Sequence, residues 1–82
     1  MIEAPQGYYV RPSRSGFFCS MDVADGKQRG LVKSDGTMKL FTSANMAAMY
    51  TRLHAEKGLM PEQEISYDDF RAYLRSEIIE KR

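Results

Sequence analysis

The sequence predicts an α+β domain, a small antiparallel sheet of three or four strands followed by two helices. Residues 8–41 contain short runs rich in aromatic and branched residues, separated by turn signals. From residue 46 onward, the apolar residues recur at helical spacing instead. A chain of 82 residues supports one modest hydrophobic core.

The strand region begins at Tyr8, and the first strand is expected over residues 8–11, followed by a turn over 12–16. The second strand is expected over 17–22. Side chains alternate along a strand, so two faces follow. Phe17, Cys19 and Met21 share one face, and Phe18, Ser20 and Asp22 share the other.

The dipeptide Asp25-Gly26 is a hairpin signal, because the turns that join antiparallel strands need a positive φ that glycine tolerates. We therefore expect a returning strand over 27–33. A second turn over 34–37 precedes a short fourth strand over 38–41.

The first helix is predicted by apolar residues at helical spacing: Met46, Met49, Tyr50 and Leu53. Thr42 or Ser43 can cap its start, because a side-chain oxygen accepts an unpaired backbone N–H there. Gly58 is placed to end it, with Leu59 folding back onto the last turn.

The second helix has the clearest start signal, because Ser66 can cap it and acidic residues occupy its first turn. Ile65 and Phe70 flank the cap as a hydrophobic staple. One apolar stripe is expected along this helix, formed by Tyr67, Phe70, Leu74 and Ile78.

Charge and cysteine content set limits on partners and location. The net charge is +1, with six Lys/Arg against four Asp/Glu in residues 1–41 and six against seven in residues 42–82. The basic surplus therefore lies on the predicted sheet. A single cysteine fits a reducing compartment. With no secretory signal and no apolar run of about 20 residues, we expect a cytoplasmic protein.

No residue pattern in the chain indicates catalysis. His54 has no cysteine or carboxylate at metal-ligand spacing, and we expect a partly exposed histidine near a helix end. Cys19 is expected to be a small buried residue. Residues 26–30 lack the spacing of a phosphate-binding loop. We therefore predict no catalytic residue, no metal and no cofactor.

The predicted sheet combines basic and aromatic groups, which bind phosphates and reach base edges in DNA. The candidate DNA-binding residues are Tyr9, Arg11, Arg14, Phe18, Lys27, Arg29, Lys33 and Lys39. The alternative is a solvated sheet face with its aromatic residues under a helix. The near-zero net charge favours that alternative on composition alone.

Residues 5–31 resemble the amino-terminal arm-binding domain of phage lambda-type tyrosine recombinases, the integrases. The residues that carry the resemblance are Pro5, Tyr9 and Arg11, then Gly16, Phe17, Phe18, Cys19 and Asp22, then Gly26, Lys27, Gly30 and Leu31. The resemblance implies a three-stranded sheet backed by one helix that binds double-stranded DNA through the sheet.

Residues 65–70 with Tyr73 and Leu74 also resemble the opening helix of an integrase core-binding domain. On that basis residues 1–58 would form the sheet-plus-helix binding domain, 59–65 a linker, and 66–82 the possible start of a following domain. The recombinase active site belongs to a further domain. The chain would then be a non-catalytic part of a DNA-recombination protein from a phage or mobile element.

Two functions follow as hypotheses. The first is non-catalytic DNA binding through the sheet. The second is a small phage- or plasmid-type protein that binds and regulates or inhibits another protein. It would use the helix pair, with the apolar stripe of the second helix, or the edge of the sheet. Near-neutral charge, six methionines and the acidic second helix favour the second.

Overall fold

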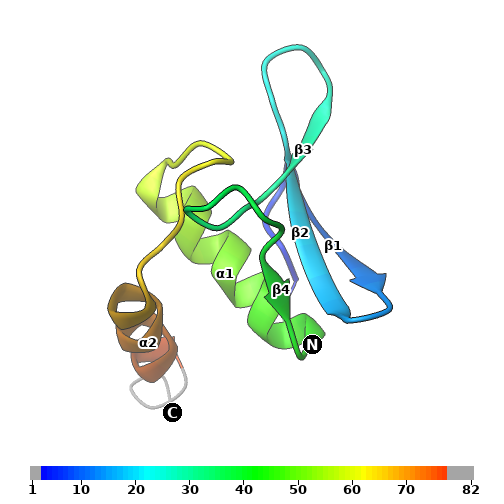
Figure 1. The fold of residues 1–82 in the computed structure, drawn as a ribbon. Helices are drawn as coiled ribbons and strands as arrows, with labels where there is room; N and C mark the ends of the chain where they lie inside the picture. The colour runs from blue at the N-terminus through cyan, green and yellow to red at the C-terminus, as the bar shows by residue number, and fades with distance from the viewer. Residues whose placement is uncertain (1–2, 78–82) are drawn as a thin grey trace.

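A computed structural model describes residues 3–77 and shows four antiparallel strands followed by two helices, which confirms the predicted fold class. The strands are β1 (Tyr8–Ser13), β2 (Gly16–Asp22), β3 (Gln28–Gly30) and β4 (Leu40–Phe41). The helices are α1 (Ala44–Lys57) and α2 (Tyr67–Arg75). Strand β2 is central, with β1 on one side and β3 and β4 on the other, at its two ends (Figure 1).

Strand β1 extends through residues that the sequence assigned to a turn, so the turn is only Arg14 and Ser15. Pro12 is tolerated in the strand because it lies where no ladder bond is lost. The Asp22 N–H donates to the Gly7 carbonyl over 2.9 Å, which makes alternate β1 residues from Gly7 onward the ones bonded to β2. Pro12 falls between them, and its nitrogen faces away from β2.

Strands β3 and β4 are shorter than expected, because the chain between them turns into the core. Leu31 is buried, and its N–H donates to the Cys19 carbonyl over 2.9 Å. Beyond it, only a single bridge joins Val32 to Met38. The predicted strands over 27–33 and 38–41 are therefore reduced to residues 28–30 and 40–41.

Helix α1 covers one face of the sheet, and the hydrophobic core lies between them (Figure 1). The predicted alternation in β2 is confirmed: Cys19 is buried, and Phe17 and Met21 pack against the core. No element of residues 3–77 covers the opposite face, which we call the open face. No helix of these residues has the length and apolar character needed to cross a membrane.

Both ends of α1 follow the sequence signals. Of the two possible caps, Ser43 is used, and its hydroxyl accepts the Met46 N–H over 3.1 Å. Gly58 adopts φ 64°, a left-handed conformation, and its N–H donates to the Ala55 carbonyl over 3.1 Å. The Leu59 N–H donates back to the His54 carbonyl over 3.3 Å, which closes the helix end.

Helix α2 begins at the predicted cap, but its apolar stripe is rotated. Ser66 accepts the Asp69 N–H over 3.1 Å. Phe70 is buried in the core, whereas Tyr67 is 74% exposed, so the predicted stripe is wrong at Tyr67. Tyr73 and Leu74 are partly buried and pack against the core. Ile78, the fourth predicted member, lies outside the described residues.

Residues 59–65, expected as a linker, pack against the same core. Pro61 and Ile65 are buried. The Ile65 N–H donates to the Tyr50 hydroxyl over 3.0 Å, and the Val32 N–H donates to the Pro61 carbonyl over 3.3 Å. These bonds attach the segment to α1 and to the loop after β3. The division of the chain into a binding domain and a following domain stays a prediction.

Candidate nucleic-acid interface

The open face carries one row of side chains from each strand. Residues directly opposite each other in a sheet share a face, so the register assigns the members. Arg11 lies opposite Phe18, which lies opposite Leu40, and Asp22 lies opposite Gln28. The residues whose side chains belong to the open face are therefore Tyr9, Arg11, Phe18, Ser20, Asp22, Gln28 and Leu40. Ser20 is buried among them.

A polar network runs across the middle of this face. The Arg11 Nη2 donates to Gln28 Oε1 over 3.0 Å, and the Ser20 hydroxyl donates to the same oxygen over 3.4 Å. Arg11 also lies over the Tyr9 ring, 5.7 Å from its centroid. These contacts hold Arg11 and Gln28 side by side on the open face.

Tyr9 is held by a second polar contact. Its hydroxyl donates to Asp22 Oδ2 over 3.0 Å, and this hydrogen bond raises the pKa of Tyr9 above its usual value. Because the carboxylate accepts this hydrogen bond, Tyr9 is oriented across the sheet toward β2. The ring of Tyr9 in turn supports Arg11.

On the β4 side of Phe18, the open face is apolar. Leu40 is 42% exposed and lies beside Phe18 in the register. Met38, 48% exposed, belongs to the segment before β4. The basic candidates Arg14 and Lys33 are exposed, in the β1–β2 turn and in the loop after β3 respectively. Neither belongs to the polar network.

Arg29, a predicted DNA-binding residue, lies on the opposite face of the sheet from Arg11. The Val23 N–H donates to the Lys27 carbonyl, so the loop inside this pair has three residues, 24–26, and not the two of Asp25-Gly26. One additional loop residue moves every β3 side chain to the other face. Arg29 consequently lies opposite Met21, on the helix side, with its Nη1 4.0 Å from Glu62 Oε2. Lys27, at the exposed hairpin end, lies opposite Val23 on that same side.

Lys39 is also removed from the open face. Its ammonium donates to Glu64 Oε2 over 3.0 Å and lies 5.5 Å from the centroid of the Tyr50 ring. Glu64 accepts the Ser34 N–H over 2.8 Å as well. The hydrogen bond from the Ser34 N–H, and to a lesser extent the one from Lys39, lowers the pKa of Glu64 below its ordinary value. The ammonium of Lys39, a predicted DNA-binding residue, is therefore already bonded within the fold.

Ser20 and Gln28 are not among the DNA-binding residues that the sequence predicts, although a signal for each exists. Ser20 shares a face with Phe18 and Asp22 through the alternation that the sequence predicts for β2. The position of Gln28 on the open face follows only from a three-residue turn. Such a turn ends in a left-handed residue, here Gly26 with φ 73°. If Asp25-Gly26 formed a two-residue turn, Arg29 would lie on the open face and Gln28 on the helix side.

His54 and Cys19 are structural. His54 is fully buried, which corrects the expectation of a partly exposed residue: its Nδ1 lies 2.9 Å from the Tyr8 hydroxyl and its Nε2 3.1 Å from the Met60 carbonyl. Burial raises the pKa of Cys19 to about 12, so its thiol is protonated at neutral pH. Among residues 3–77, no group of three or more His, Cys, Asp or Glu side chains could hold a metal ion.

No protein-family model, curated protein or solved structure matches the chain. The similarity to the integrase arm-binding domain stays a prediction that depends on the residues quoted for it.

Proposed function

We propose that this protein is a non-catalytic module that binds double-stranded DNA through the open face of its sheet. The observation that carries the proposal is the Arg11–Gln28 pair, held above Ser20 on a face that no described element covers. Arginine and glutamine are side chains that bond guanine and adenine edges in the major groove. A small sheet can enter that groove with one face toward the bases.

The ends of β2 supply candidate phosphate contacts. The β1–β2 turn carries Arg14, and the β2–β3 turn carries Lys27, both exposed. The seven residues of β2 span about 23 Å at about 3.3 Å per residue, more than the major-groove width of about 12 Å. The two turns can therefore reach the sugar-phosphate chains on both sides while the centre of the face meets the bases.

The proposal includes a cellular setting. A DNA-binding module without catalytic groups would serve an integrase-type recombination protein of a phage or mobile element, in the cytoplasm. Its role would be to position a catalytic domain on DNA and not to cleave strands.

A fluorescence-anisotropy titration of duplex DNA at low salt tests the proposal, with Arg29→Ala as the matched control for Arg11→Ala. Both changes remove one positive charge from the sheet, but only Arg11 lies on the open face. We expect Arg11→Ala to cost about 1–3 kcal/mol of binding free energy. Arg29→Ala should change affinity much less. Gln28→Ala should change the preference among duplex sequences.

Salt dependence provides a second readout. The logarithm of the association constant should fall steeply with the logarithm of salt concentration, and Arg14→Ala should reduce that slope by about one. Absence of any response at high micromolar protein would contradict the proposal. Equal losses for Arg11→Ala and Arg29→Ala, or chemical-shift changes confined to residues 66–77, would contradict it too.

Binding of another protein is the second candidate function, and the exposure of Tyr67 favours it. The surface differs from the predicted stripe, because Phe70 and Leu74 contribute to the fold's own core. A partner would meet Tyr67 and the 53% exposed Met60 instead. Tyr67→Ser should then abolish partner binding and leave duplex DNA binding unchanged.

A further inference from the structure

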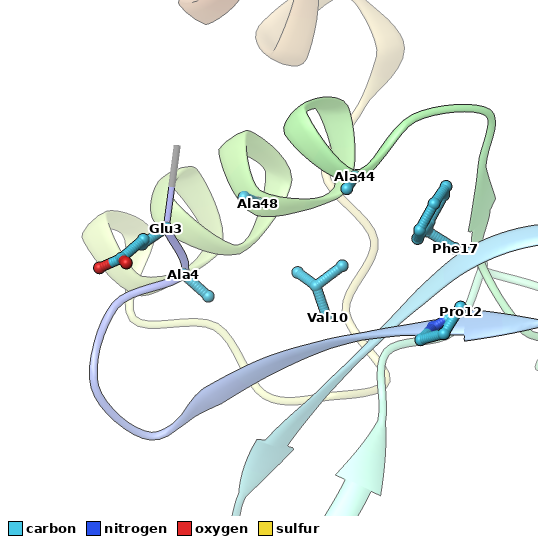
Figure 2. Close-up of a pocket in the computed structure, with 7 residues that line it drawn as sticks. All are labelled: Glu3, Ala4, Val10, Pro12, Phe17, Ala44 and Ala48. Atoms are coloured by element: carbon cyan, nitrogen blue, oxygen red, sulfur yellow. The ribbon is translucent and has the colours of Figure 1, made fainter. Parts of the chain in front are cut away.

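An apolar groove lies between the outer edge of β1 and the first turns of α1 (Figure 2). Its volume is about 280 Å³, and its lining comes from the sheet, the helix and the segment before β1. The lining residues are Glu3, Ala4, Val10, Pro12, Phe17, Ala44 and Ala48. Glu3 is the one charged member among them, and the groove is otherwise lined by hydrocarbon.

The rim of the groove presents backbone groups without a partner strand. Because Gly7 is bonded to Asp22, the alternation of the ladder directs the N–H and C=O of Val10 away from β2. The C=O of Pro12 faces the same way. Within residues 3–77, no strand pairs with this edge of β1. At the other end, the Tyr8 N–H donates to the Pro5 carbonyl over 3.0 Å, which closes the edge there.

We propose that the edge of β1 and the groove together bind an extended peptide segment of another protein. The peptide pairs with Val10 through two backbone hydrogen bonds and donates a third to the Pro12 carbonyl. The residue opposite Val10 has its side chain on the helix side of the sheet, so that side chain enters the groove. Strand addition to an open edge is a general mode of peptide recognition.

The groove defines the chemistry of the peptide. Small-molecule pockets begin near about 300 Å³, so this groove accommodates one bulky aliphatic or aromatic side chain and not a whole ligand. The Glu3 carboxylate at the groove favours a lysine or arginine two positions from that side chain. The expected partner sequence is therefore an alternating strand with one large apolar residue and a nearby basic residue.

A second copy of this chain satisfies the edge less well. If two β1 strands met about a two-fold axis at Val10, Pro12 would lie opposite Tyr8 of the other copy. The Tyr8 N–H is already bonded to Pro5 and Pro12 has no N–H, so only the two bonds at Val10 would form. A separate peptide with free N–H groups supplies the third bond.

The test uses the whole chain labelled with ¹⁵N and the probe peptide acetyl-Thr-Lys-Thr-Leu-Thr-Lys-Thr-amide. We expect amide shifts at Val10, Ala44 and Ala48 that saturate at millimolar peptide. An analogue with N-methyl-leucine loses the N–H that bonds the Val10 carbonyl, and one with serine in place of leucine loses the groove contact. Each analogue should bind about tenfold more weakly, which corresponds to about 1.4 kcal/mol.

Two variants of the protein complete the test. Ala44→Leu fills the groove from α1 and should abolish binding, with circular dichroism confirming the fold. Arg11→Ala, on the open face, should leave peptide binding unchanged, which separates this site from the DNA interface. Absence of shifts, shifts on the open face, or equal affinity for the N-methyl peptide would overturn the proposal. Self-association that shifts Val10 without peptide would assign the edge to a second copy and overturn it as well.

Discussion

Gly16 lies where the backbone of Phe41 leaves no room for a side chain. It adopts φ 139°, and a Cβ atom at this position would overlap the Phe41 carbonyl oxygen. Phe41 comes this close because β4 pairs with the start of β2, opposite Phe17. The glycine therefore serves two needs at once, a backbone conformation that other residues rarely adopt and space for β4.

Gly16→Ala should lower the free energy of unfolding by at least about 1–3 kcal/mol. The strain of φ 139° in alanine and the overlap of its Cβ with the Phe41 carbonyl add to each other. Gly36→Ala is the matched control, since Gly36 has φ 87° but open space around it. The control should show the conformational cost alone, about 1–2 kcal/mol. Urea denaturation measures both. Equal losses would show that the contact with Phe41 carries no weight.

His54 connects three parts of the chain through its two ring nitrogens. Tyr8 belongs to β1, His54 to α1, and Met60 to the segment after it. Burial lowers the pKa of His54 below its ordinary value of 6.5, because desolvation disfavours the charged ring. The folded protein therefore binds this proton less readily than the unfolded chain does.

The stability contributed by neutral His54 should be complete above about pH 6.5 and should decrease as the pH falls through the lower pKa of the folded state. Urea denaturation at about pH 7.5 and about pH 5 measures the loss. His54→Gln removes this titration and should flatten the dependence. The pKa values of Asp35 and Glu64 are lowered from 3.8 and 4.5, so they titrate below this range. A decrease that persists unchanged in His54→Gln would contradict the assignment.

At the scale of the elements, α2 is joined to the sheet by aromatic packing. The Phe70 ring lies 5.4 Å from the centroid of Tyr50 and 6.1 Å from that of Phe41. These three rings link α2, α1 and β4 in one cluster. Lys57 and Asp69 add an exposed ion pair at 3.5 Å, which contributes little beside the buried rings.

Phe70→Ala should destabilise the fold by about 3–5 kcal/mol, because it removes a buried ring and leaves a cavity. Tyr67→Ala is the control on the same helix, and its exposed ring should cost no more than about 0.5 kcal/mol. Thermal melting of the two variants makes the comparison. A small loss for Phe70→Ala would instead favour α2 as the start of a following domain.

At the scale of the whole molecule, one core is shared by the sheet, both helices and residues 59–65. Leu31, Tyr50, Ile65 and Phe70 belong to a single cluster, although they come from four segments. The ion pair between Lys39 and Glu64 joins the loop before β4 to the segment before α2. A module that ended at residue 58 would lack two of these four residues.

A chain of residues 1–58 should therefore lose cooperative folding, whereas a chain of residues 1–65, which retains Pro61 and Ile65, should fold with reduced stability. Amide peak dispersion and thermal melting distinguish the three lengths, with the full chain as reference. Full dispersion and an unchanged melting temperature for residues 1–58 would establish them as an independent domain. That outcome would support the division drawn from the integrase resemblance.

The sequence by itself determined the class, the order of the elements, the starts of both helices and the end of α1. The alternation in β2, a cap at Thr42 or Ser43, the cap at Ser66 and the role of Gly58 follow from the sequence, because each depends on residues a few positions apart. The structure selects Ser43. These interactions form between residues that are close in the sequence, so the neighbouring residues are sufficient to predict them.

Only the tertiary structure decided which residues meet. One additional residue in the β2–β3 turn placed Gln28 beside Arg11 and moved Arg29 to the helix side. Lys39 met Glu64, 25 positions away, and His54 met Tyr8, 46 positions away. These outcomes depend on strand register and on packing between distant segments. A periodic pattern gives the faces of each element, but the partner of each face is chosen by the free energy of the assembled core.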